Sequence, residues 1–225
     1  MVDRSDEISL LGDYKLPAPL ERAPLESDSP EIFRVTGQHV HRALAVLNPR
    51  KACGPDGTPS WLLKEYCDVV AYPITTILNA SYAEQRLPTI WKMADVTPLP
   101  RKKPVVDIQK ELRPISLTPC ISKVAEEFVV DGFVKPAVMN ILDDNQYGAI
   151  PNSSTTMALI SMLHSWSLGT DGNGATVRTL LLDYRKAFDL IDHSILVRKL
   201  RNQCKLPASI INWILDFFIG QIPAD

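Results

Sequence analysis

The chain has 225 residues, of which 45% are hydrophobic and 22% charged, so its composition is that of an ordinary globular protein with one core or slightly more. The first residues are charged, and each apolar stretch is shorter than the roughly 18 residues that a membrane span needs. The four cysteines are too scattered for a disulfide scaffold or a paired zinc site. We therefore expect an intracellular chain, nuclear or cytoplasmic, with no signal peptide, no transmembrane segment and reduced thiols.

The formal net charge of −2 is unevenly distributed. Residues 1–31 hold 8 acids and 3 bases together with four prolines, and they show no sustained period, which is typical of a linker or disordered lead-in. Residues 32–225 hold 18 acids and 21 bases. This mildly basic remainder permits a phosphate-rich partner and does not identify one.

Helical spacing of apolar residues, together with capping residues, predicts a succession of helices along 32–225. Thr36 is expected to cap the first helix, Ser60 the second, and Pro73 to start the third. The expected helices cover residues 36–48, 60–70, 73–82, 121 to just before Pro136, the region around 157–166, 194–202 and 207–218.

The turn-rich stretch 51–59 predicts a shaped loop. Two short β-prone pieces, 94–100 and 112–117, predict a hairpin with a long basic tip, and the apolar run 175–184 predicts a strand covered on both faces. Helices therefore alternate with a few strands, so the expected class is α+β, mixed and rich in helix.

Asp183 follows the apolar run directly, where a buried strand would hold a carboxylate rigidly at the edge of a sheet. It is therefore a candidate ligand for Mg²⁺, which prefers carboxylate oxygens. A second interpretation is that Asp183 only caps the turn that leaves the strand. The strand pattern alone does not decide between them.

Two further segments carry candidate binding residues. The hairpin tip, with Arg101 to Lys103, Lys110 and Arg113, is suited to close over a triphosphate, although a solvated loop explains the same charges. The polar segment 145–156 offers amides and hydroxyls to a nucleic-acid backbone, although capping by Ser153 or Ser154 explains it as well. The paired acids at 143–144 are expected to cap or to be solvated, and the histidines share no metal spacing.

Five segments, taken in order, resemble the reverse transcriptase domain of LINE-type, jockey-like (non-LTR) retrotransposons. They are KACGPDGTPSWLLK, LPTIWKMADVTPLPRKK, LRPISLTPCISKVAEE, DDNQYGAIPNSSTTMAL and VRTLLLDYRKAFDLIDHSILVRKL, within residues 33–218. The resemblance implies a right-hand fold of fingers, palm and thumb, an RNA template with a DNA primer and deoxynucleoside triphosphates as partners, and Mg²⁺ (or Mn²⁺) as the cofactor.

By this resemblance, Asp183 matches the first catalytic, metal-binding aspartate of the palm, and the carbonyl of Tyr184 would lie beside the same ions. Gln146, Tyr147 and Gly148 match the segment near the template. The resemblance assigns nucleotide binding to Lys102, Lys103, Arg113, Lys186, Ala187 and Phe188.

The family's second and third aspartates belong to a Tyr-x-Asp-Asp box that this sequence does not contain. We therefore expect a partial polymerase fold in 32–225, with the fingers and the first palm strand, lacking the rest of the palm and the thumb. The expected function is RNA-directed DNA polymerase by family, catalytically incomplete in this chain. The alternatives are a non-enzymatic module that binds RNA or protein, and a metal hydrolase that uses Asp183 with Asp189 or Asp192.

Overall fold

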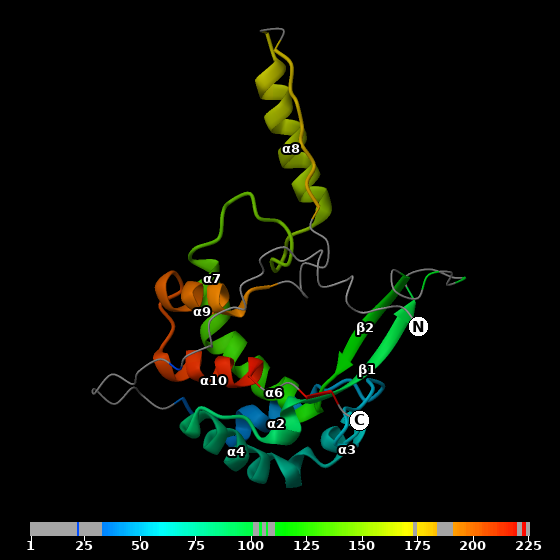
Figure 1. The fold of residues 1–225 in the computed structure, drawn as a ribbon, viewed down its shortest axis with the longest axis vertical. Coiled ribbons are helices and arrows are strands. Elements are labelled where there is room, and N and C mark those ends of the chain that lie inside the picture. Colours follow the sequence, from blue (N-terminus) through cyan, green and yellow to red (C-terminus); the bar gives the residue numbers. More distant parts are fainter. Residues whose placement is uncertain are drawn as a thin grey trace, which may run out of the picture. The chain divides into compact units, whose positions relative to one another are not determined.

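The computed structural model describes residues 22, 33–100, 104, 107, 111–172, 175–183, 191–219 and 222–223. The chain divides into two compact units, residues 1–136 with 192–225 (unit 1) and residues 137–191 (unit 2). Figure 1 shows that helices make up most of the described part of unit 1, which also has one hairpin, whereas the described part of unit 2 combines a long helix with loops and an extended segment. The described structure is thus a mixed α and β fold rich in helix, as predicted. Except for Arg22, the expected lead-in of residues 1–31 lies outside the described residues.

The first described helix, α2 (Gly37–Ala45), forms as its sequence predicts. The Thr36 hydroxyl caps it by accepting a hydrogen bond from the backbone N–H of His39, at 3.3 Å. Val40 and Leu44 lie one turn apart and are both fully buried. This apolar stripe packs α2 against α4.

Helices α3 (Ser60–Glu65) and α4 (Cys67–Glu84) correct two expected boundaries. Ser60 is the first residue of α3 and does not cap it, because its hydroxyl lies 3.0 Å from the Cys120 sulfur instead. Pro73 does not start a helix, since α4 begins at Cys67 and runs through it. Pro73 and Val69, the residue four positions earlier, are both exposed, so water can satisfy the carbonyl that proline leaves unpaired.

The predicted hairpin is present. A 3-10 turn, η1 (Thr89–Lys92), leads into β1 (Met93–Pro100), which pairs antiparallel with β2 (Leu112–Leu117) from Asp95↔Leu117 to Pro100↔Leu112. On its other edge, β1 pairs in parallel with the short β3 (Ile222–Pro223). The hairpin therefore opens at Pro100 and Leu112, toward the expected basic tip.

Helix α6 (Cys120–Val129) continues as the π-helical turn η2 (Val130–Val134) and then as α7 (Lys135–Met139). The α-helix does end before Pro136, but the helical path passes through that proline. A π turn directly before a proline accommodates its missing N–H by shifting the hydrogen-bond register. Helices α9 (His193–Asn202) and α10 (Ala208–Phe218) agree with the predicted segments.

The core of unit 1 lies among α2, α4, α6 and α10 (Figure 1). Its most deeply buried large side chains include Leu44, Leu78, Ile211 and Leu215. Burying each such side chain contributes about 1.5–3 kcal/mol. Tyr82 forms ring contacts with Phe33 at 4.9 Å and with Trp213 at 5.6 Å between centroids, and its hydroxyl donates to the Ala125 carbonyl. Burial raises the pKa of this phenol far above its usual value.

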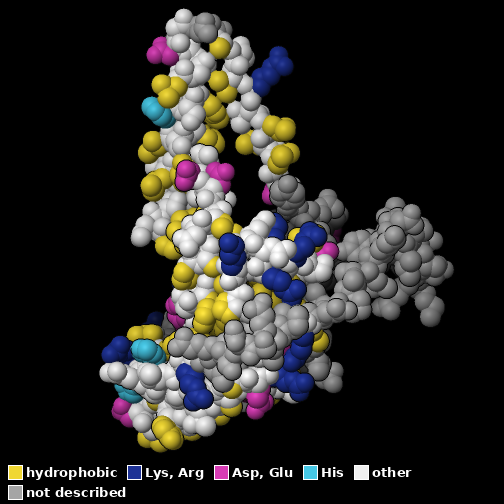
Figure 2. All heavy atoms as spheres, turned by 90° about the vertical axis from the view of Figure 1, so that its left-hand side faces the viewer, with side chains coloured by type: hydrophobic (Ala, Val, Ile, Leu, Met, Phe, Trp, Pro, Cys, Tyr) yellow, Lys and Arg dark blue, Asp and Glu magenta, His cyan; other side chains and the backbone are white. Residues whose placement is uncertain are grey.

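Unit 2 contains α8 (Thr155–Thr170), which begins at the predicted cap Ser154. None of the described residues of unit 2 is buried. The predicted strand at 175–184 is wrong over its described part, because residues 175–183 form no strand, and Leu180, Leu181 and Leu182 are 73–85% exposed. In Figure 2, hydrophobic side chains follow the described surface of α8 and this extended segment.

No helix within the described ranges combines the length and the apolar character that a bilayer crossing requires.

Candidate functional site

The loop that the first segment of the resemblance encodes is docked against the start of α6. Gly54 is buried, and a methyl group in its place would lie 2.5 Å from the backbone nitrogen of Pro119. The loop closes on itself, since Gly57 donates its N–H to the Gly54 carbonyl at 3.0 Å with φ +64° at Gly57, and Thr58 donates to the Asp56 carboxylate. The shaped loop expected from the sequence is therefore a packed part of unit 1.

The hairpin places Arg113 in β2, opposite Leu99 and one pair from the open end. Arg113 is exposed. Its guanidinium, which offers a planar fork of N–H donors, is thus accessible to an anion beside the hairpin opening. Lys102 and Lys103, the other expected phosphate ligands of the hairpin, lie outside the described residues.

The segment 143–154 is a turn held by its own polar groups. The Asp143 carboxylate accepts hydrogen bonds from the backbone N–H and the side-chain amide of Asn145, at 2.8 and 3.1 Å. The Gln146 amide donates to the Gly148 carbonyl at 2.9 Å. The Ser154 hydroxyl accepts from the N–H of Met157 at the start of α8. Asp143 and Ser154 have the local turn and capping roles expected of them, and a template contact for Gln146, Tyr147 and Gly148 stays a prediction.

Asp183, the expected catalytic aspartate, is exposed at the end of the extended segment in unit 2. Among the described residues, no group of three or more possible metal ligands includes Asp183. The described residues therefore do not assemble a site of three or more ligands for Mg²⁺ or Mn²⁺ around Asp183. Tyr184, Lys186, Ala187 and Phe188 lie outside the described residues, as does Asp189.

Asp192 is an N-cap. Its carboxylate accepts from the N–H groups of Ser194 and Ile195, at 2.8 and 3.2 Å, as well as from the Ser194 hydroxyl. The hydrogen bond from the Ser194 hydroxyl lowers the pKa of Asp192, and the backbone hydrogen bonds add to the effect. This confirms the capping role. Because capping explains why Asp192 is present, the residue gives no support to the hydrolase alternative.

The sequence-predicted residues are thus distributed over both units. Arg113 belongs to unit 1, whereas Asp183 and the segment with Gln146 belong to unit 2.

No family model and no curated protein matches the chain.

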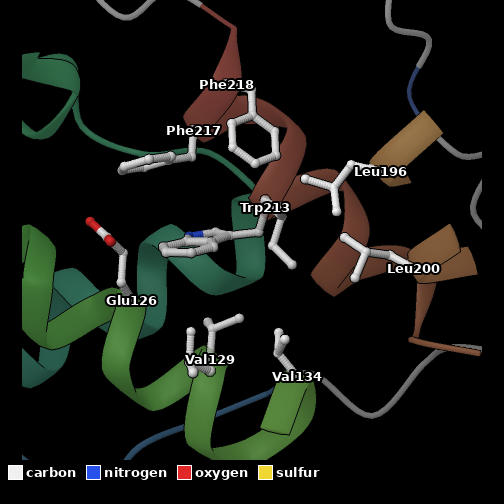
Figure 3. Close-up of a pocket in the computed structure, with 10 residues that line it drawn as sticks. Glu126, Val129, Val134, Leu196, Leu200, Trp213, Phe217 and Phe218 are labelled. Atoms are coloured by element: carbon white, nitrogen blue, oxygen red, sulfur yellow. The ribbon is translucent and has the colours of Figure 1, made fainter. Parts of the chain in front are cut away.

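Sequence reasoning did not find a pocket of about 280 Å³ in unit 1, which Figure 3 shows. The Trp213 ring of α10 lies near its centre, with Val129 and Val134 below it and Leu196 and Leu200 of α9 beside it. The lining is apolar except for Glu126. Burial raises the pKa of Glu126, and a hydrogen bond from Ser122 and the charge of Lys123 offset part of that rise.

The second missed feature is a cluster of three different donor atoms where α2 meets the start of α4. His41 Nε2, Cys67 Sγ and an oxygen of Asp68 all lie within 4.8 Å of one another. His41 comes from a helix 26 residues earlier in the chain than Cys67, so no metal-binding spacing marks the set in the sequence. The adjacent Cys-Asp pair was the only local signal.

Proposed function

We propose that the chain is part of an RNA-directed DNA polymerase of the LINE type, from a non-LTR, jockey-like retrotransposon, and supplies its fingers and the first aspartate of its palm. One observation carries the proposal: five segments that resemble this family follow one another in the family's order between residues 51 and 200. Any one of these segments alone would be a weak signal. Their order is difficult to obtain by chance, because each is a different combination of turn, strand and helix signals.

Two contacts in the structure support the proposal, because they join the first three of these segments in one folded unit. Strands β1 and β2, which form the hairpin, come from the second and third segments. Gly54 of the first segment packs directly on Pro119 of the third. If the resemblance of each segment were due to chance, these segments would not be expected to pack against one another.

The proposed role of the hairpin follows from the chemistry of Arg113. An exposed arginine near the hairpin opening can hold phosphate oxygens with two parallel hydrogen bonds, which a lysine cannot do. The expected partners are therefore the triphosphate of an incoming nucleotide and the backbone of an RNA template with its DNA primer.

The 225-residue chain by itself is predicted not to extend a primer. Nucleotidyl transfer in this family depends on three aspartates, and this sequence holds a match for one of them. Asp183 is exposed, and in the described part of the chain it belongs to no group of three or more possible metal ligands.

A chimera tests the proposal. The palm remainder and thumb of an active LINE-type reverse transcriptase would be joined after Phe218, and RNA-templated primer extension would be measured with Mg²⁺. We expect extension by the chimera and its loss in Asp183→Asn. Asp171→Asn, which changes another exposed aspartate of unit 2, is the matched control and should keep activity. A folded chimera whose extension survives Asp183→Asn would contradict the proposal.

The second candidate is a non-enzymatic module that binds RNA, and it is favoured by the fact that, among the described residues, Asp183 belongs to no group of three or more possible metal ligands. Both candidate functions predict that the hairpin binds RNA. The affinity should fall steeply as salt is added, because salt screens the phosphate contacts. They differ in the chimera: a module that only binds RNA would not support extension. Binding should weaken in Arg113→Ala and stay unchanged in Arg42→Ala, a basic side chain on α2.

A further inference from the structure

We propose that His41, Cys67 and Asp68 form a binding site for a transition-metal dication, with Zn²⁺ as the preferred ion. The site lies where α2 packs against the first turn of α4, within unit 1. The site is independent of the proposed polymerase function, because His41, Cys67 and Asp68 lie outside the five segments on which that proposal rests.

Two of the three distances between the donor atoms are close to those around a tetrahedral ion, and the third is at most 4.8 Å. Typical bonds of zinc to nitrogen, sulfur and oxygen place the donors about 3.4–3.6 Å from one another. His41 Nε2 lies 3.4 Å from Cys67 Sγ and 2.7 Å from Asp68 Oδ1. The first distance already fits. The second needs the carboxylate to withdraw by less than 1 Å, which an 86% exposed side chain can do by rotating.

Without an ion, the carboxylate and the thiol compete for one ring nitrogen of His41. A single ring nitrogen, His41 Nε2, faces both the carboxylate oxygen and the thiol sulfur. It carries either one hydrogen or one lone pair, so it cannot donate to Asp68 and accept from Cys67 at the same time. A cation between the three atoms uses the lone pairs of all of them.

The chemistry of the donors selects the class of ion. Imidazole nitrogen and thiolate sulfur favour zinc and similar borderline-soft ions, whereas Mg²⁺ and Ca²⁺ take oxygen ligands. Three protein ligands leave a fourth tetrahedral position for water or another donor. On binding, the Cys67 thiol gives its proton to solvent and the sulfur forms the bond to the metal.

The fold holds two of the three ligands rigidly. Cys67 is buried as the first residue of α4, and His41 follows the fully buried Val40 in α2. Packed helices fix donor atoms more precisely than loops do. The alternative interpretation, an exposed His41–Asp68 ion pair beside a cysteine that packs in the core, contributes little stability and does not use the lone pairs of the Cys67 sulfur.

A bound ion would fasten α2 to α4. Because the ion binds only the folded arrangement, it should raise the temperature of unfolding, and a chelator should reverse this change.

Cobalt spectroscopy of the full chain, prepared without a histidine tag, tests the site. Titration with Co²⁺ should give one equivalent bound, the intense visible bands of a tetrahedral ion and a thiolate-to-cobalt charge-transfer band in the near ultraviolet. Zn²⁺ should displace the cobalt and remove these bands.

Three variants then identify the ligands. Cys67→Ser should abolish the charge-transfer band, and His41→Ala and Asp68→Asn should each weaken Co²⁺ binding by about tenfold or more. His39→Ala and Cys53→Ser, which change another histidine of α2 and another free cysteine outside the cluster, are the matched controls and should bind as the unchanged chain does. Circular dichroism reports whether each variant folds.

Because Cys67 is buried, the Cys67→Ser variant can fail to fold. The Co²⁺ affinity of Asp68→Asn, which changes an exposed side chain, then tests the proposal. A folded Asp68→Asn that binds Co²⁺ as tightly as the unchanged chain would overturn the proposal. So would a folded, unchanged chain that shows no charge-transfer band at saturating Co²⁺.

Discussion

Asp216 is a buried carboxylate that connects three separate parts of unit 1. Asp216 lies in α10 and is only 7% exposed. One oxygen accepts from the Leu87 N–H at 2.8 Å and from the Lys92 ammonium at 2.7 Å, and the other accepts from Arg22 at 3.0 Å. Burial by itself raises the pKa of Asp216, but the hydrogen bonds from Lys92 and Leu87 and the charges of Lys92 and Arg22 outweigh it, so the pKa lies below its usual value.

Asp216→Asn should destabilise unit 1 by about 2 kcal/mol at neutral pH, because the Lys92 charge then loses its buried counter-charge. A carboxyl whose pKa is lowered by folding contributes its stability above the pKa of the unfolded chain, about 3.9, and loses it as the pH falls through the folded pKa. The difference between the two proteins should therefore be large at pH 7 and shrink below about pH 4. Urea unfolding across this range measures it.

Asp131→Asn is the matched control for that measurement. Asp131 pairs with Lys135 one helical turn away, but both side chains are more than half exposed. Such an exposed pair contributes little to stability, because water screens it. An equal loss of stability in the two variants would show that burial of Asp216 is not what makes it important.

At the scale of elements, the docking of the 51–59 loop on α6 depends on the absence of a side chain at residue 54. In Gly54→Ala the added methyl group would lie within 2.8 Å of three backbone atoms of Thr118 and Pro119. Backbone cannot rotate away as a side chain can, so the loop must lift. We expect a loss of about 2 kcal/mol, in the range typical of overpacking.

Thermal or urea unfolding measures that loss, with Gly37→Ala as its control. Gly37 starts α2, and a methyl group there meets only the Thr75 hydroxyl at 3.8 Å, an ordinary contact. Gly37→Ala should leave stability unchanged or raise it slightly, because alanine favours helix. If Gly54→Ala were equally harmless, the close packing of loop and helix would not contribute to stability.

The sequence predicts the helices well because each carries its own apolar period. Val40 with Leu44 and Val124 with Ala125 are buried as their spacing indicates. The boundaries are less predictable, since they depend on contacts elsewhere: Ser60 contacts Cys120 instead of capping α3. Pro73 stays inside α4, where Pro73 and the Val69 carbonyl that it leaves unpaired lie on exposed residues.

The apolar run at 175–183 and the cluster around His41 were mispredicted or missed for a related reason. An apolar run indicates that a segment would gain from burial, but a strand also needs a neighbour to pair with, and no described segment pairs with this one. Likewise, His41 and Cys67 meet only because α2 packs against α4. Local patterns contain neither piece of information. They mark Asp183 and Arg113 as candidate residues, but they do not show which residues the fold brings together.

At the scale of the whole molecule, the two units differ in burial: exposed apolar side chains occur in both, but among the described residues buried ones occur only in unit 1. All described residues of the buried hydrophobic core belong to unit 1. In unit 2, α8 and the segment 175–183 expose several large side chains, among them Leu163 and Leu181, which are 56% and 85% exposed. Adjoining exposed apolar side chains favour association, because water is released when they are covered.

We therefore expect the isolated chain to self-associate through unit 2. The double variant Leu163→Lys with Leu181→Lys should increase the monomeric fraction several-fold, as measured by size-exclusion chromatography with light scattering. Lysine costs little there, since both positions are exposed. Val46→Lys is the control, because Val46 is also 80% exposed but lies in unit 1, at the end of α2. An unchanged chain that is already monomeric, or a control that works equally well, would show that unit 2 does not drive association.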